Sequence, residues 1–126
     1  MRYMMMHKLD ETLPEAFNPS PEFVARMEAF MKEVAQSGIL VAAEGLCPTA
    51  TDATRITVSG GKTTVTDGPF TETKELIAGF ALVDVRSHEE ALEWGRRFAD
   101  VFAETIGEVE VDIRRVYEAP EPGQTA

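Results

Sequence analysis

The sequence has few of the features that mark secreted or membrane-spanning proteins. It contains one cysteine, Cys47, so an intramolecular disulfide is impossible, as is usual in a reducing compartment. The longest apolar run, residues 76–83, is far too short to cross a bilayer. The first residues lack the long apolar stretch and cleavage site of a signal peptide. These absences predict a cytoplasmic protein with no membrane partner.

Basic residues are scarce relative to acidic ones. The chain has 12 Lys and Arg against 22 Asp and Glu, a formal net charge of −10 at pH 7. A surface of this sign repels the phosphate backbone of nucleic acids and the headgroups of anionic lipids. We therefore expect neither DNA nor RNA among the partners of this protein.

Patterns for metals and cofactors are also missing. Two histidines and one cysteine stand at no spacing typical of zinc ligands. Gly60-Gly61 lies between two β-branched runs, which is typical of a hairpin and differs from the phosphate-binding pattern G-x-G-x-x-G. We expect no metal and no cofactor.

What is present predicts one folded unit. A chain of 126 residues, 44 % of them apolar, is long enough for one core. We expect a single domain over residues 1–118. The tail, residues 119–126, holds two prolines and a glycine and is expected to be frayed.

Helix signals occur twice. Ser20 before Pro21 is typical of an N-cap, and the apolar residues that follow at helical spacing end at Gly38, a residue suited to a left-handed cap. Ser87 and Glu90 have the spacing of a capping box, which opens a second helix. The apolar stripe of that helix consists of Ala91, Gly95, Phe98 and Phe102.

Strand patterns surround these helices. The predicted strands are residues 2–7, 39–43, 55–59, 63–66, 76–85 and 109–114. The order β-α-β, hairpin, β-α-β predicts an α+β, ferredoxin-like fold. Two helices cover only one face of such a sheet, and the central strand is apolar on both faces. We therefore expect a second copy of the sheet to cover the other face in a homodimer.

A long motif begins at Asp67-Gly68-Pro69-Phe70 and continues to Phe80. This motif resembles that of the DGPF-domain branch of the YCII-related family, and the resemblance extends over residues 1–118. Other matching positions are Gly38-Ile39-Leu40, Glu44-Gly45-Leu46, Arg55, Trp94 and Arg114. The resemblance implies a dimeric α/β-barrel arrangement. Some YCII-related proteins are enzymes proposed to use a His–Asp pair, and some DGPF proteins are encoded beside, or fused to, extracytoplasmic-function sigma factors.

Two side chains are candidates for catalysis. Asp67 follows a strand and precedes a sharp turn, where folds place reactive groups, although an aspartate that only accepts hydrogen bonds from turn backbone fits as well. His7 ends the first strand, and its ordinary pKa of about 6.5 suits acid–base chemistry near neutral pH. A purely structural His7 is the alternative.

Four charged residues are candidates for ligand binding. Glu44 interrupts an apolar stretch and, if buried, needs a partner such as Arg55 or Arg114, which would also make a purely structural ion pair. Lys74 stands in a mixed-charge loop that is otherwise expected to be solvated. The sequence therefore predicts a pocket at strand ends, in which Arg55 or Lys74 holds an anionic group.

Two functions stay open at this point, and with them the question whether the protein is an enzyme. In the first, it binds or acts on a small molecule by general acid–base chemistry, and Asp67 orients or pairs with His7. In the second, it is a non-catalytic interaction protein, an accessory to a sigma factor.

Overall fold

The computed structural model describes residues 1–14, 16–70 and 76–118, and within them the predicted order of elements is confirmed. Each strand ends within two residues of its expected position. The helices are α1 (Pro21–Ser37) and α2 (His88–Thr105). The strands are β1 (Arg2–Lys8), β2 (Leu40–Gly45), β3 (Thr54–Ser59), β4 (Lys62–Asp67), β5 (Ile77–Asp84) and β6 (Glu110–Arg115). The predicted tail, residues 119–126, lies outside the described residues.

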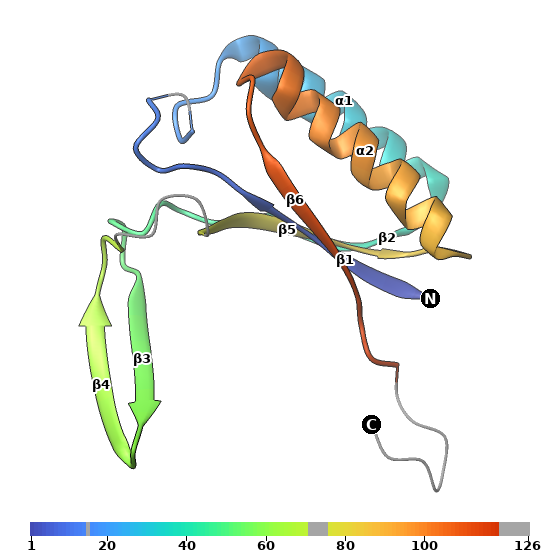
Figure 1. Cartoon of the computed structure of the whole chain (residues 1–126). Coiled ribbons are helices and arrows are strands. Elements are labelled where there is room, and N and C mark those ends of the chain that lie inside the picture. Colours follow the sequence, from blue (N-terminus) through green and yellow to red (C-terminus); the bar gives the residue numbers. More distant parts are fainter. Residues whose placement is uncertain (15, 71–75, 119–126) are drawn as a thin grey trace, which may run out of the picture.

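Four strands form one antiparallel sheet in the order β2-β5-β1-β6, while β3 and β4 pair only with each other. Both helices lie on the same face of the four-stranded sheet, and the β3–β4 hairpin extends away from it (Figure 1). With its two β-α-β units and this strand order, the chain is compatible with a ferredoxin-like fold that carries an extra hairpin.

The helix boundaries follow from local chemistry. The Ser20 hydroxyl accepts a hydrogen bond from the Phe23 amide at 3.1 Å, and Gly38 ends α1 at a φ of 85°. The Ser87 hydroxyl accepts a hydrogen bond from the Glu90 amide, also at 3.1 Å. Each contact satisfies a backbone group that a helix end would leave unpaired. The predicted caps are therefore confirmed.

The core lies between the sheet and the two helices. Tyr3 and Met5 of β1 and Val83 of β5 are buried there, and so is the predicted apolar stripe of α2. A Cβ added to Gly95 would lie 2.3 Å from Cδ1 of Ile113 on β6. The glycine therefore lets α2 approach the sheet closely at this point.

Where paired residues cross the sheet beside His7, the neighbouring strands carry only small side chains. His7 on β1 is paired with Gly79 on β5, and Gly79 is paired with Gly45 on β2. The neighbouring row holds Ala81 and Ala43 in the corresponding places. Directly opposite residues in an antiparallel sheet point to the same face, so these small residues lie beneath the helices together. The space above them stays partly unfilled.

No helix of the described residues covers the opposite face of the sheet (Figure 1). Met4 pairs with Leu82, and Met6 pairs with Phe80; all four side chains are partly exposed. We call this four-residue surface the open face. Its apolar composition agrees with the expectation that the central strand is apolar on both sides.

The hairpin also exposes apolar side chains. Gly60 and Gly61 adopt φ values of 57° and 77°, the left-handed backbone that a tight two-residue turn requires, so the predicted turn is confirmed. Ile56 lies opposite Val65 and on the same side as Val58, and these three side chains are 63 to 68 % exposed.

Candidate ligand-binding cavity

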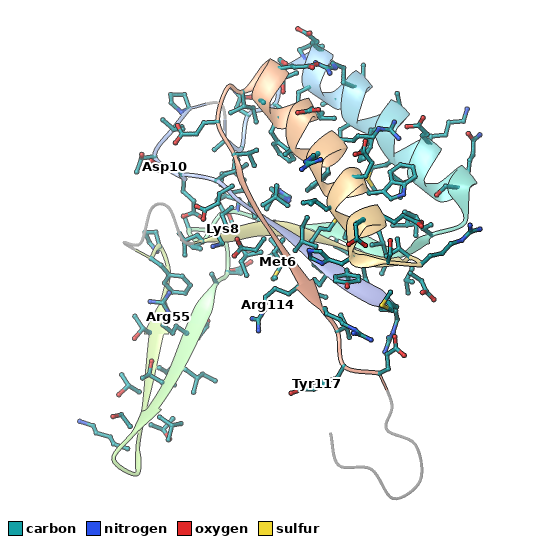
Figure 2. All side chains as sticks on the ribbon, turned by 45° about the vertical axis from the view of Figure 1, so that its right-hand side comes forward. Met6, Lys8, Asp10, Arg55, Arg114 and Tyr117 are labelled. Atoms are coloured by element: carbon teal, nitrogen blue, oxygen red, sulfur yellow. The ribbon has the colours of Figure 1, made fainter. Side chains whose placement is uncertain are left out.

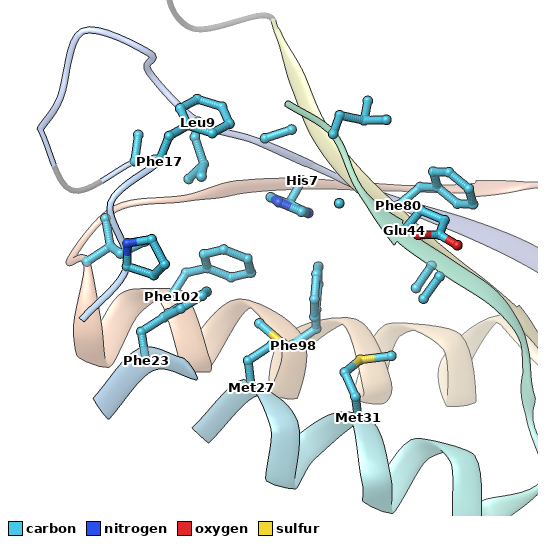
Figure 3. A pocket seen from close by; sticks show the side chains of 18 of the residues that line it. His7, Leu9, Phe17, Phe23, Met27, Met31, Glu44, Phe80, Phe98 and Phe102 are labelled. Carbon is cyan, nitrogen blue, oxygen red and sulfur yellow. The ribbon is translucent and has the colours of Figure 1, made fainter. Parts of the chain in front are cut away.

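A cavity of about 620 Å³ lies between the helices and the part of the sheet that carries small side chains. On the side of the sheet it is bordered by Gly45, Ala43 and Ala81. On the side of the helices it is bordered by large apolar side chains (Figure 3). Those side chains are Phe23, Met27 and Met31 of α1, Phe98 and Phe102 of α2, and Ile106, which follows α2 as its C-cap. Small residues on one side and large ones on the other therefore produce the cavity.

The loop between β1 and α1 closes one end of the cavity. Leu9, Ala16, Phe17 and Pro19 supply this wall. At the end of β2, the exposed Glu44 and Leu46 also border the cavity, but Glu44 pairs with Phe80 of the open face, so its carboxylate lies on the other side of the sheet. The cavity is therefore apolar inside, and the charge that borders it stands on an exposed strand end.

His7 is the polar side chain inside this apolar space. Its ring lies between the strands and α2, with its centroid 5.5 Å from that of Phe98 and 4.8 Å from that of Phe102 (Figure 3). The Nδ1 atom is buried and has no hydrogen-bond partner. Burial lowers the pKa of His7 from 6.5 to about 4, because a charged imidazolium loses its hydration there. At neutral pH the ring is therefore uncharged.

The pairing of Asp67 with His7 stays a prediction, and within the described chain Asp67 does not border the cavity that holds His7. Asp67 ends β4, where its Oδ1 lies 3.5 Å from the Thr54 hydroxyl, and it borders a separate hollow of about 350 Å³. The physical reason is that β4 pairs only with β3, so the hairpin carries Asp67 away from the sheet that holds His7.

The residues after Asp67 hold the base of the hairpin. The Phe70 amide donates to the Thr49 hydroxyl at 3.0 Å, and that hydroxyl donates to Oε2 of Glu11 at 2.6 Å. The Thr49 amide also donates to Oε1 of Glu11, at 2.7 Å. A Cβ on Gly68 would lie 1.8 Å from the Thr49 carbonyl oxygen, so only glycine permits this approach.

The remaining candidates lie outside the cavity, apart from Glu44. The Arg55 guanidinium stands 4.1 Å from the ring centre of Phe70, at the base of the hairpin. Arg114 is exposed on β6, where it is paired with Met4 beside the open face (Figure 2). Lys74 lies outside the described residues. Of the predicted residues that the structure describes, His7 lies inside the cavity and Glu44 stands at its border.

The sequence reasoning missed Gly45 and Gly79 as determinants of the site. Gly79 interrupts the predicted strand 76–85, and a glycine inside a strand is a signal of bulges or close approaches, whereas Gly45 lies two residues beyond the predicted strand 39–43. Their alignment with His7 depends on the register of three strands. That register is set by long-range pairing, which no local pattern reveals.

In residues 1–14, 16–70 and 76–118, no group of three His, Cys, Asp or Glu side chains is arranged to hold a metal ion. No helix in that part of the chain has the length and apolar character needed to cross a membrane. Cys47 is an exposed free thiol.

Together, the fold and the cavity define a small α+β protein with space for a ligand between its helices and its sheet. Residues 1–114 match the sequence model of the YCII-related domain, and the chain belongs to that family. A relative, the uncharacterised protein R00369 of Rhizobium meliloti (strain 1021), is 35 % identical over 126 aligned positions, and the match covers 98 % of each chain. The predicted membership of the YCII-related family is confirmed.

Proposed function

We propose that this YCII-related protein binds a small, largely apolar molecule in the cavity beside His7. The observation that carries the proposal is an apolar space of about 620 Å³ with one unpartnered imidazole in it. Small-molecule sites are mostly apolar, roughly 300–1,000 Å³ in volume, with a few polar groups that fix orientation. Protein interiors are otherwise closely packed, so ordinary packing of the core does not account for a space of this size.

The state of His7 favours binding over acid–base catalysis. A general base works best when its pKa lies near the operating pH. Burial moves the pKa of His7 to about 4, so the ring is a weak base at pH 7. No carboxylate among the described residues bonds to its Nδ1 to raise that basicity. The imidazole is suited to one hydrogen bond with an uncharged ligand.

Filling the cavity from within tests this proposal. Gly45 borders the cavity, and a Cβ built on it meets no atom within 4 Å, so Gly45→Phe places a ring in open space. We expect the variant to fold and to lose the increase in melting temperature that naphthalene gives the parent. Calorimetry with a saturating probe measures it, since a ligand at 100 times its Kd adds about 2.7 kcal/mol of stability.

The matched control is Ala103→Phe, which adds the same ring on the exposed side of α2. This control is expected to respond to naphthalene as the parent does. If the parent shows no response to naphthalene, or if Gly45→Phe responds equally well, the cavity is not a binding site.

We also propose that the protein is a homodimer, with the open faces of two copies packed together as in a dimeric α/β-barrel. Two apolar surfaces of the chain support this proposal, the open face and the exposed side of the hairpin. Apolar patches of this kind mark interaction surfaces. A second copy would cover the open face in the way that the helices cover the other side of the sheet.

A further inference from the structure

The orientation of the His7 ring decides which nitrogen a ligand meets. A Cβ on Gly79 would lie 2.4 Å from Cε1 of His7 and 3.2 Å from its Nδ1, so this edge of the ring rests against the strand. Nδ1 is the ring nitrogen that is buried without a partner. A molecule in the cavity therefore approaches Nε2.

The burial of Nδ1 also bears on the tautomer. An uncharged imidazole carries one N–H donor and one acceptor nitrogen. A buried donor without a partner is rarer in proteins than an unpaired acceptor. The ring therefore keeps its proton on Nε2, where the N–H can donate to a molecule in the cavity.

The lining also discriminates by charge. Among the residues that border the cavity in the described part of the chain, Glu44 is the charged one, and its pairing with Phe80 puts its carboxylate on the side of the open face, away from His7. No Arg or Lys belongs to that lining. A carboxylate ligand would lose its hydration without gaining a cationic partner, which is costly.

From these features we propose that the cavity selects uncharged carbonyl compounds with an apolar ring system, whose carbonyl oxygen accepts a hydrogen bond from Nε2–H of His7. The inference rests on the proposed binding function and names the ligand class for the same cavity. It replaces the anionic ligand expected from the sequence, because Arg55 lies at the hairpin and no described cation borders the cavity.

Three naphthalenes of nearly equal shape test this selection. The ketone 2-acetylnaphthalene carries the acceptor, 2-isopropenylnaphthalene replaces C=O with C=CH2, and 2-naphthoate carries the negative charge. Titration calorimetry on the full chain is expected to give the ketone an affinity about five-fold above that of the hydrocarbon, the worth of one ordinary hydrogen bond. Binding of 2-naphthoate is expected to be weaker than that of either neutral probe.

The variant His7→Phe keeps an aromatic ring and removes the donor. It is expected to bind the ketone and the hydrocarbon equally. Equal binding of these two probes by the parent, or tightest binding of 2-naphthoate, would overturn the ligand class and leave the binding function standing. If no probe binds the parent, both proposals fail together.

A measurement on the parent keeps the proposal testable if His7→Phe does not fold. Nitrogen-15 NMR of the histidine side chains distinguishes the two neutral tautomers. The spectrum at pH 7 is expected to show a protonated Nε2 and an unprotonated Nδ1 for His7. A proton on Nδ1 would contradict the proposal, because Nε2 could then only accept.

Discussion

At the scale of single residues, His7 shows how neighbours change the chemistry of a side chain. Two phenylalanines of α2 and the backbone of Gly79 surround the ring. This environment removes hydration and supplies no hydrogen bond to Nδ1. A histidine that would titrate near neutral pH in water becomes a neutral ring in an apolar space.

The lowered pKa of His7 predicts how stability depends on pH. The unfolded chain takes up this proton as the pH falls below about 6.5, whereas the folded protein resists it down to about pH 4. The contribution of His7 is therefore complete above pH 6.5 and is lost as the pH falls toward 4. In denaturant titrations the loss is expected to reach up to about 3 kcal/mol in this window.

The variant His7→Phe isolates this contribution, because it keeps the ring and cannot titrate. Its stability is expected to fall less steeply than that of the parent between pH 6.5 and 4. The exposed His88 supplies the control, and His88→Gln is expected to follow the parent. Parallel curves for the parent and His7→Phe would mean that His7 is not the buried group described above.

At the scale of elements, Thr49 joins three separate parts of the chain. Its hydroxyl donates to Glu11 in the loop after β1 and accepts from Phe70 at the base of the hairpin. The Glu11 loop continues into the residues that wall the cavity. The motif at residues 67–70 therefore supports the cavity wall indirectly.

Thr49→Val removes both hydroxyl contacts while keeping the shape of the side chain. We expect a loss of about 1–3 kcal/mol in unfolding free energy, since two partly buried partners lose a hydrogen bond. Chemical denaturation measures this change. The control Thr51→Val lies in the same loop, is exposed, and is expected to change stability by less than about 0.5 kcal/mol. Equal unfolding free energies for Thr49→Val and Thr51→Val would show that the two hydroxyl contacts of Thr49 do not stabilise the fold.

Local patterns predicted the elements well because helix caps and tight turns depend on neighbouring residues. Ser20 and Ser87 begin helices, and Gly60-Gly61 turns the hairpin, as the sequence indicated. Strand register, in contrast, arises from pairing between distant segments. Local patterns therefore could not predict that Gly45 and Gly79 align with His7. They also could not predict that Asp67 lies on a separate hairpin.

At the scale of the whole molecule, two apolar surfaces have no cover within the described chain. The helices protect one side of the sheet, while Met4, Met6, Phe80 and Leu82 remain partly exposed on the other. The dimeric arrangement that the sequence resemblance implies and the exposed apolar side of the hairpin both favour the proposed cover, a second copy of the chain.

A single charge on the open face tests the dimer. Met6 lies between Phe80 and Asp112 in the sheet, so Met6→Glu adds a negative charge to an apolar surface beside another carboxylate. Sedimentation at micromolar concentration is expected to show a dimer for the parent and a monomer for Met6→Glu. Val24→Glu, at an exposed apolar position on α1, is expected to remain dimeric. A monomeric parent would refute the proposed interface.

The most direct test of the binding function uses the methionine methyl groups as reporters. Met27 and Met31 border the cavity, whereas Met4 and Met6 lie on the open face, on the other side of the sheet. NMR of carbon-13 methionine methyls is recorded while 2-acetylnaphthalene is added. We predict that the signals of Met27 and Met31 move and saturate together, while those of Met4 and Met6 stay in place. Movement of Met4 and Met6 alone, or of no methionine at all, would contradict binding in the cavity.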